Sequence, residues 1–200
     1  MARTIVGGLV AGIVLFVMGF IFWATPLAEL AYTDAGEAQS AAVQTALAQN
    51  LSGTGTYIIP NPKTASGTVL YGKGPVAQVQ FNAAGFPVED MSMILTGFIF
   101  ALVAGLLIAF GLAAVGGGGR SFANVARLVV LFSLGITTWS ILAQPVFNHF
   151  GWGYWIYSFV AETIGLILAG LIVARWFLPP APAHVHPVER VEPAESVETA

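Results

Sequence analysis

The sequence predicts an all-α membrane protein, a bundle of four transmembrane helices with a small α+β extracytoplasmic cap between helices 1 and 2. Hydrophobic residues make up 56% of the 200 residues and charged residues only 8%, whereas globular proteins carry about 25% charged residues. Four apolar segments reach the length of roughly 20 residues that crosses the hydrocarbon core as a helix. One long segment between the first two, residues 26–91, is rich in polar and turn residues.

The four apolar segments are predicted as spans because they combine length with an almost complete lack of charge. No charged residue lies between Arg3 and Glu29 or between Asp90 and Arg120. Pro145 falls in the last turn of the third segment, where a kink or an early end is expected. The predicted spans are residues 5–24, 93–115, 128–147 and 154–176. The predicted organisation is helix 1 over residues 1–25, the cap over 26–91, helices 2–4 over 92–178 and a disordered cytoplasmic tail over 179–200.

The basic residues near the span ends predict the orientation of the chain. With alternating helices, only Lys63 and Lys73 fall on one side, inside the long loop, and four arginines fall on the other: Arg3, Arg120, Arg127 and Arg175. The arginine side is therefore predicted to be cytoplasmic. Both termini are then cytoplasmic in a bacterial inner membrane, and aromatic residues form a belt at the outer interface: Trp23, Trp152, Tyr154, Trp155 and Tyr157.

The cap is predicted to contain one helix and three strands. Asp34 and Glu37 resemble a capping box, so a helix is expected over residues 35–50. Beyond it the apolar period changes to two, and strands are expected over residues 56–60, 68–71 and 76–82. The cap is too small to bury a core of its own and is expected to lie on the outer ends of the helices.

Two stripes of polar and small residues are predicted to face each other, or to face a shared interior, inside the bundle. Spacings of three and four residues place five polar side chains on one face of the third span: Ser133, Thr137, Ser140, Gln144 and Asn148. The same spacings place a second set on one face of the fourth span: Ser158, Glu162, Gly165 and Ala169. The turn between the two spans is short, so Glu162 is expected at the depth of Ser140, with Gln144 one turn nearer the outside.

Glu162 anchors the candidate intramembrane polar site, which comprises Glu162, Ser158, Ser140, Gln144 and Thr137. It lies about 10 Å below Trp155 along the helix, where a carboxylate is costly unless it is paired or neutral. No Lys or Arg lies at that depth in any span. Two interpretations stay open: a proton, ion or ligand site, or a brace in which Glu162 hydrogen-bonds Ser140 or Gln144 and only fixes helix packing.

Small residues predict close helix contacts at two places. Ala161, Gly165 and Ala169 follow a small-xxx-small pattern in the fourth span. Gly8 and Gly12 follow the same pattern in the first span. The pair in the first span fits either a dimerisation face or a contact inside the bundle.

Two local motifs accompany this layout: a Gly-x-Tyr-x-x-Pro-like strand at Gly55, Tyr57 and Pro60, and an aromatic–glycine turn at residues 150–154. With them, the chain resembles uncharacterised four-helix bacterial inner-membrane proteins that have a long first periplasmic loop. The resemblance covers most of the chain. It implies a topology and brings no known activity.

The function predicted from these features is that of a non-catalytic accessory or scaffold subunit of a bacterial inner-membrane complex. Its expected partners are the lipid bilayer and either a membrane protein or a second copy of the chain. The alternative is a small transporter, a proton-handling protein or a lipid- or quinone-binding protein that uses Glu162 and the facing stripe. No nucleophile with a base and no metal-ligand cluster is recognisable, so no catalytic, cofactor or metal residue is predicted. A net charge of −3 argues against nucleic acid as a partner.

Overall fold

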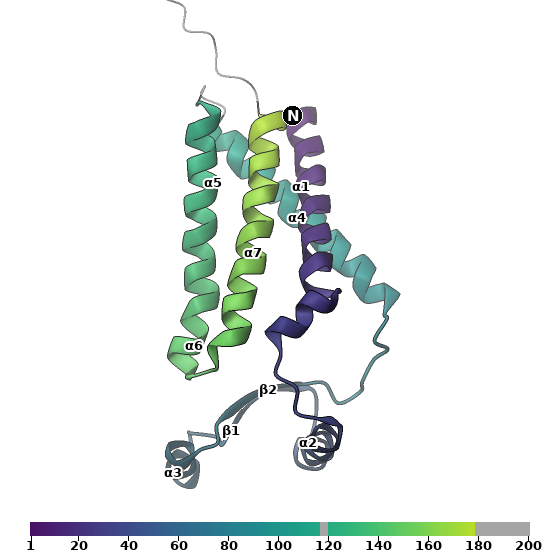
Figure 1. Cartoon of the computed structure of the whole chain (residues 1–200), viewed down its shortest axis with the longest axis vertical. Coiled ribbons are helices and arrows are strands. Elements are labelled where there is room, and N and C mark those ends of the chain that lie inside the picture. The colour runs from purple at the N-terminus through teal and green to yellow at the C-terminus, as the bar shows by residue number, and fades with distance from the viewer. Residues whose placement is uncertain (117–119, 179–200) are drawn as a thin grey trace, which may run out of the picture.

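The computed structural model describes residues 1–116 and 120–178, which form four long helices with a small unit beyond one end of them (Figure 1). Within these residues, four helices are long and apolar enough to cross a membrane: Ala2–Trp23, Met91–Val115, Phe122–Asn148 and Trp152–Phe177. They correspond to the four predicted spans, so the prediction of four helices of membrane-spanning length and composition is confirmed. The predicted tail, residues 179–200, lies outside the described residues.

Helix α7 (Trp152–Ile172), which the π-helical turn η3 (Val173–Phe177) extends, lies between two neighbours in the bundle (Figure 1). It packs against α1 (Ala2–Trp23) on one side and α5 (Phe122–Thr137) on the other. Helix α4 (Met91–Gly116) crosses behind α7 at a wide angle and packs mainly against α1. The most apolar stretch of the fourth span is therefore 39% buried, against 11% for the second span.

The glycine pair of the first span packs against α4 of the same chain. A Cβ atom on Gly105 would overlap the backbone N of Gly12 and the backbone O of Gly8, and one on Gly12 would lie 2.6 Å from Cα of Leu102. The two backbones can approach this closely only because no side chain separates them. Of the two interpretations left open by the sequence, the structure supports the contact inside the bundle.

The small-residue face of α7 packs against α1. Ala161, Gly165 and Ala169 are all buried, and a Cβ on Gly165 would lie 3.8 Å from the side chains of Leu15 and Met18. At Gly165 the stripe of the fourth span therefore meets α1 and does not face the third span. The close contact with α5 is made by Gly170 instead, where an added Cβ would lie 2.6 Å from Val129 Cγ1.

The third span is a continuous helix with one wider turn. It consists of α5, a π-helical turn η2 (Thr138–Leu142) and α6 (Ala143–Asn148). Proline lacks a backbone N–H and its ring crowds the carbonyl four residues earlier, and a π turn relieves this by inserting one residue. The helix passes Pro145 and ends at Asn148, where His149 adopts a left-handed φ of 55°. The expected irregularity before Pro145 is present, but the helix does not end early.

The segment between α1 and α4 contains a short 3₁₀ helix η1 (Pro26–Ala31), helices α2 (Glu37–Asn50) and α3 (Ala65–Lys73), and strands β1 (Gly55–Ile59) and β2 (Ala77–Phe81). Its residues 32–90 are called the outer unit. The strands pair antiparallel, with Tyr57 opposite Val79. Two of the three predicted strands are confirmed. The strand expected at residues 68–71 is wrong, because these residues belong to α3. The hydroxyl of Thr64 caps that helix by accepting a hydrogen bond from the Gly67 N–H at 3.0 Å, and four β-prone residues are too few to outweigh it.

The predicted capping box of the first outer helix does not form. Helix α2 begins after Gly36, which has a φ of 77°. The Asp34 carboxylate accepts a hydrogen bond from the Gly36 N–H at 2.9 Å, so it closes the turn before the helix. Gly36, with its positive φ, occupies the N-cap position itself. Asp34 therefore lies two residues before the cap, where it cannot make the reciprocal bonds of a capping box.

The outer unit extends beyond the bundle and buries almost nothing. Helix η1 packs on α1 and α7, while α2, α3 and the two-stranded sheet lie past the helix ends (Figure 1). From residue 32 to residue 90, all of which are described, Gly67 is the only buried residue. The absence of a core in this unit agrees with its small size.

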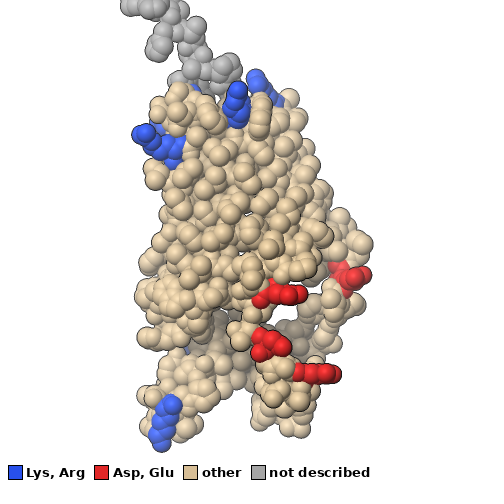
Figure 2. All heavy atoms as spheres, viewed as in Figure 1, with Lys and Arg blue, Asp and Glu red and all other residues tan. Residues whose placement is uncertain are grey.

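Charge is distributed asymmetrically along the bundle (Figure 2). Basic side chains gather at the end that carries the N-terminus, and acidic side chains appear toward the outer unit. At the basic end, the Arg3 guanidinium donates a hydrogen bond to the Trp176 carbonyl at 2.8 Å. This cation therefore also neutralises the negative end of the fourth span.

The charge asymmetry yields a topology prediction. Reporters fused after Val115 are expected to be cytoplasmic, and reporters placed near Gly67 or Gly151 are expected to be outside, because basic residues stay on the cytoplasmic side. Paired alkaline phosphatase and green fluorescent protein fusions measure this directly. Fluorescence from the Gly67 fusion without phosphatase activity would show that the orientation is the reverse of the predicted one.

Candidate functional site

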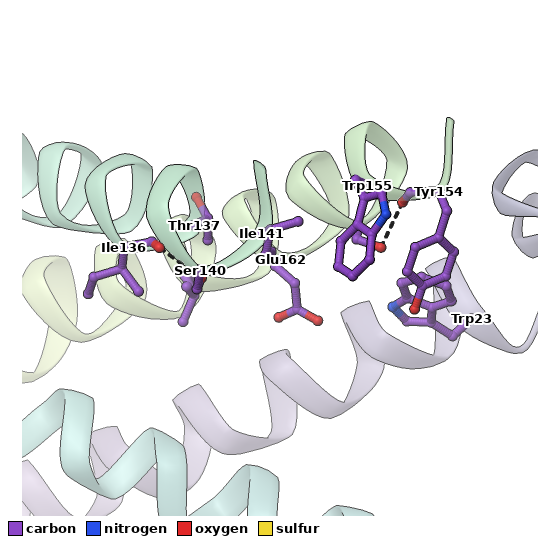
Figure 3. Close-up of a pocket in the computed structure, with 10 residues that line it drawn as sticks. Trp23, Ile136, Thr137, Ser140, Ile141, Tyr154, Trp155 and Glu162 are labelled. Carbon is purple, nitrogen blue, oxygen red and sulfur yellow. Dashed lines mark hydrogen bonds between the residues drawn. The ribbon is translucent and has the colours of Figure 1, made fainter. Parts of the chain in front are cut away.

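Glu162 faces an open cavity of about 430 Å³ between α1, the third span and α7 (Figure 3). In the close-up the carboxylate points from α7 toward α1, away from the backbone of the third span. The cavity lining has three sources. Helix α1 contributes Trp23; the third span contributes Ile136, Thr137, Ser140 and Ile141; and α7 contributes Tyr154, Trp155, Ser158, Glu162 and Leu166.

Four of the five predicted site residues line this cavity: Thr137, Ser140, Ser158 and Glu162. Gln144 does not belong to the lining, because its side chain is bonded along the third span. Its Nε2 donates to the Ser140 carbonyl at 3.4 Å, and its Oε1 accepts from Asn148 at 3.3 Å. The structure thus brings four of the predicted residues together in one cavity and leaves Gln144 outside it.

The hydroxyl groups near Glu162 are bonded to the backbone of their own helices. Ser140 Oγ donates to the Ile136 carbonyl and Ser158 Oγ donates to the Tyr154 carbonyl, each at 2.8 Å. The expected brace from Glu162 to Ser140 or Gln144 is therefore not the arrangement in the structure. Each hydroxyl gives its only hydrogen to a carbonyl, which leaves its oxygen lone pairs free to accept from a molecule in the cavity.

The hydrogen bond that joins the third and fourth spans is made by two threonines. Thr137 Oγ1 and Thr163 Oγ1 are 2.8 Å apart, with side chains only 2% and 6% exposed. The sequence reasoning missed Thr163, which lies beside Glu162 but outside the predicted stripe. Counting outward from Phe150 would have found it, because Thr137 and Thr163 lie equally far from that residue along the chain.

The π turn divides the polar stripe of the third span. Ser133 and Thr137, before the turn, are buried against α7, whereas Ser140 is exposed to the cavity. An inserted residue rotates every later position around the helix axis. Burial therefore changes along the stripe, from the covered Ser133 and Thr137 to the exposed Ser140, although Thr137 and Ser140 line the same cavity.

Aromatic side chains form the outer end of the cavity. The Trp23 ring centroid lies 5.9 Å from that of Tyr154 and 5.3 Å from that of Tyr157, and the Tyr157 hydroxyl donates to the Phe22 carbonyl. Trp155 stacks on Phe150 with ring centroids 6.0 Å apart. Three residues of the predicted interfacial belt thus also line the cavity: Trp23, Tyr154 and Trp155.

An apolar groove of about 560 Å³ adjoins this cavity on the α4 side. The two share Ile136 and Leu166 as lining residues, so they meet at the middle of the bundle. The groove is lined almost entirely by apolar residues of α4, α5 and α7, and Arg120 lies at its far end. A molecule at Glu162 could therefore extend apolar groups toward α4 without leaving the protein surface.

The chemistry of the cavity is defined by one carboxylate. Its described lining contains Glu162, four hydroxyl-bearing side chains (Thr137, Ser140, Ser158 and Tyr154), and no Lys or Arg. Within residues 1–116 and 120–178, no group of three or more His, Cys, Asp or Glu side chains could hold a metal ion. Glu162 thus has no countercharge from the residues around it.

No known family model, curated protein or solved structure matches this chain.

Proposed function

We propose that this protein is a non-catalytic accessory or scaffold subunit of a bacterial inner-membrane complex, and that it binds its partner through the outer unit, residues 32–90. The observation that carries the proposal is the near absence of burial in that unit, where Gly67 alone is buried. A two-stranded sheet is marginally stable without further packing. The free edges of β1 and β2 are ready templates for pairing with another chain.

Exposed apolar side chains in the unit support the same proposal. Val43 on α2 is 56% exposed and Ile58 on β1 is 51% exposed. Helix α2 buries no residue at all, so its fourteen residues gain no tertiary stabilisation within the chain. A partner that covers α2 and the sheet would supply the missing apolar burial.

The experiment is purification from native membranes in a mild detergent, followed by mass spectrometry of co-purifying proteins. A stoichiometric partner is expected for the wild type. The double variant Val43→Glu/Ile58→Glu is expected to recover at least about tenfold less partner, because covering a carboxylate without pairing it costs several kcal/mol. Melting of the bundle should not change, since both side chains are exposed.

The matched control is Gln44→Glu/Ala77→Glu, which adds the same charge to α2 and to the sheet. Gln44 follows Val43 on α2, and Ala77 precedes Gln78, the cross-strand partner of Ile58, so its exposed side chain lies on the opposite face of the sheet from Ile58. This control is expected to retain the partner. A homogeneous protein that purifies alone, or equal recovery by both double variants, would contradict the proposed docking surface.

A second candidate function is favoured by the Glu162 cavity: a small transporter, a proton-handling protein or a protein that binds a lipid or quinone. A carboxylate inside a membrane span is costly unless it is neutral or paired, and this one lines a cavity of ligand size, about 430 Å³. Retention of a small molecule through purification, lost in Glu162→Gln, would support this candidate.

A further inference from the structure

We propose that the Glu162 cavity binds a free amphipathic organic cation, an ammonium group that carries apolar substituents. Glu162 supplies the counterion, and Trp23, Tyr154 and Trp155 supply aromatic walls. The inference rests on the second candidate function, ligand binding at Glu162, and names the class of ligand.

Charge is the first argument for a cation. The described lining of the cavity carries one acidic side chain and no basic one. The hydroxyls of Ser140 and Ser158 donate to backbone carbonyls, so they present oxygen lone pairs to the cavity. A cationic ligand would restore neutrality and face oxygen acceptors, whereas an anion would meet a carboxylate and no positive side chain.

Aromatic residues provide the second argument. Organic ammonium groups bind over the faces of Trp and Tyr rings, because the ring quadrupole attracts positive charge. Trp155, Ser158 and Glu162 follow one another at spacings of three and four on α7, which places them on one helix face. Figure 3 shows Trp155 on the same wall of the cavity as Glu162, with Tyr154 and Trp23 beyond it.

Depth and shape indicate a free cation rather than a lipid head group. Glu162 lies two helical turns below Trp155, or about 10 Å, on the hydrocarbon side of the aromatic residues that mark a membrane interface. A phospholipid ammonium stays at the interface, whereas a cation with apolar substituents can enter to this depth. The adjoining apolar groove, which shares Ile136 and Leu166 with the cavity, extends the space for those substituents.

The test measures binding of two probes by isothermal titration calorimetry, with the full chain in an uncharged sugar detergent. The cation is benzyltrimethylammonium, and the control probe is neopentylbenzene, its uncharged isostere. The wild type is expected to bind the cation at least about tenfold more tightly than the isostere, because only the cation gains from the carboxylate and the rings.

Three variants separate the contributions of individual residues. Glu162→Gln keeps the shape of a side chain that is exposed to the cavity, so the fold should survive by circular dichroism while cation affinity falls at least about tenfold. Trp155→Leu should weaken the cation about fivefold and leave the isostere unchanged. Glu29→Gln makes the same substitution at an exposed carboxylate of η1, outside the cavity, and should bind as the wild type does.

Contrary outcomes fall into distinguishable classes. Equal affinity for both probes, unaffected by Glu162→Gln, would overturn the cation class and leave ligand binding intact. Binding of neither probe by a wild type that retains a lipid or quinone would likewise refute only the cation. Binding of neither probe by a protein that also purifies without any small molecule would refute both the cation and ligand binding at Glu162. Proton exchange at Glu162 with no ligand would refute the cation and support the proton-handling form of the second candidate function.

Discussion

Gly105→Ala is expected to destabilise the bundle by about 1–3 kcal/mol, the usual range for overpacking a closely packed contact. An added Cβ would overlap backbone atoms of both Gly8 and Gly12. Backbone cannot rotate out of the way as a side chain does, so α1 and α4 must separate along their contact. The contact between these two helices is the most extensive in the bundle, and its loss should appear as a lower melting temperature in detergent.

Gly97→Ala is the matched control on the same helix. A Cβ at Gly97 would meet nothing within 4 Å, so alanine there should leave stability unchanged or raise it by up to about 1 kcal/mol through helix propensity. If both variants melt alike, the close approach of α1 and α4 does not contribute to stability in the way proposed.

Gly67→Ala is expected to unfold the outer unit and leave the bundle intact. A Cβ at this position would overlap the carbonyl oxygen of Asn61 and lie 2.6 Å from Thr64 Oγ1, the atom that caps α3. Loss of the cap and overpacking at position 67, the only buried position in the unit, should lower the stability of the unit by about 1–3 kcal/mol. For so small a unit, that cost should be sufficient to release α3.

The measurement is hydrogen exchange of the outer unit followed by mass spectrometry, with bundle melting recorded in parallel. Faster exchange over residues 61–73 with an unchanged melting temperature is expected. Gly72→Ala is the control on the same helix, because an added Cβ there would meet nothing within 4 Å. Protection that is equal in the two variants would show that the packing at Gly67 does not hold the unit together.

Span number and position follow from the sequence because lipid imposes one strong requirement on it. Each span must satisfy its backbone groups internally, which selects helices of a fixed minimum length. The outer unit is subject to no such requirement. Residues 68–71 contain β-prone side chains, yet they form a helix because the Thr64 cap and the Gly67 contact with Asn61 fix the chain locally. Four residues hold too little periodicity to reveal that outcome.

The sequence predicted which residues form most of the candidate site, but it did not predict how they are arranged. Glu162 stands out in the sequence as the one charged residue well inside a span, and Thr137, Ser140 and Ser158 join it in one cavity. Their helix faces depend on the π turn at Thr138–Leu142 and on which helix each face of α7 meets. Trp23 joins the cavity through tertiary packing of α1, which no spacing within the third or fourth span encodes.

The position of α7 has a consequence for biogenesis. Translation delivers α1 and α4 first, and their glycine contact can form as soon as both are inserted. Helix α5 packs chiefly on α7, so its buried Ser133 and Thr137 have no partner on another helix until the last segment is inserted. During that interval the Thr137 hydroxyl can donate only within its own helix, to the Ser133 carbonyl. The arrival of α7, rather than the insertion of any earlier segment, is therefore the event that completes the bundle.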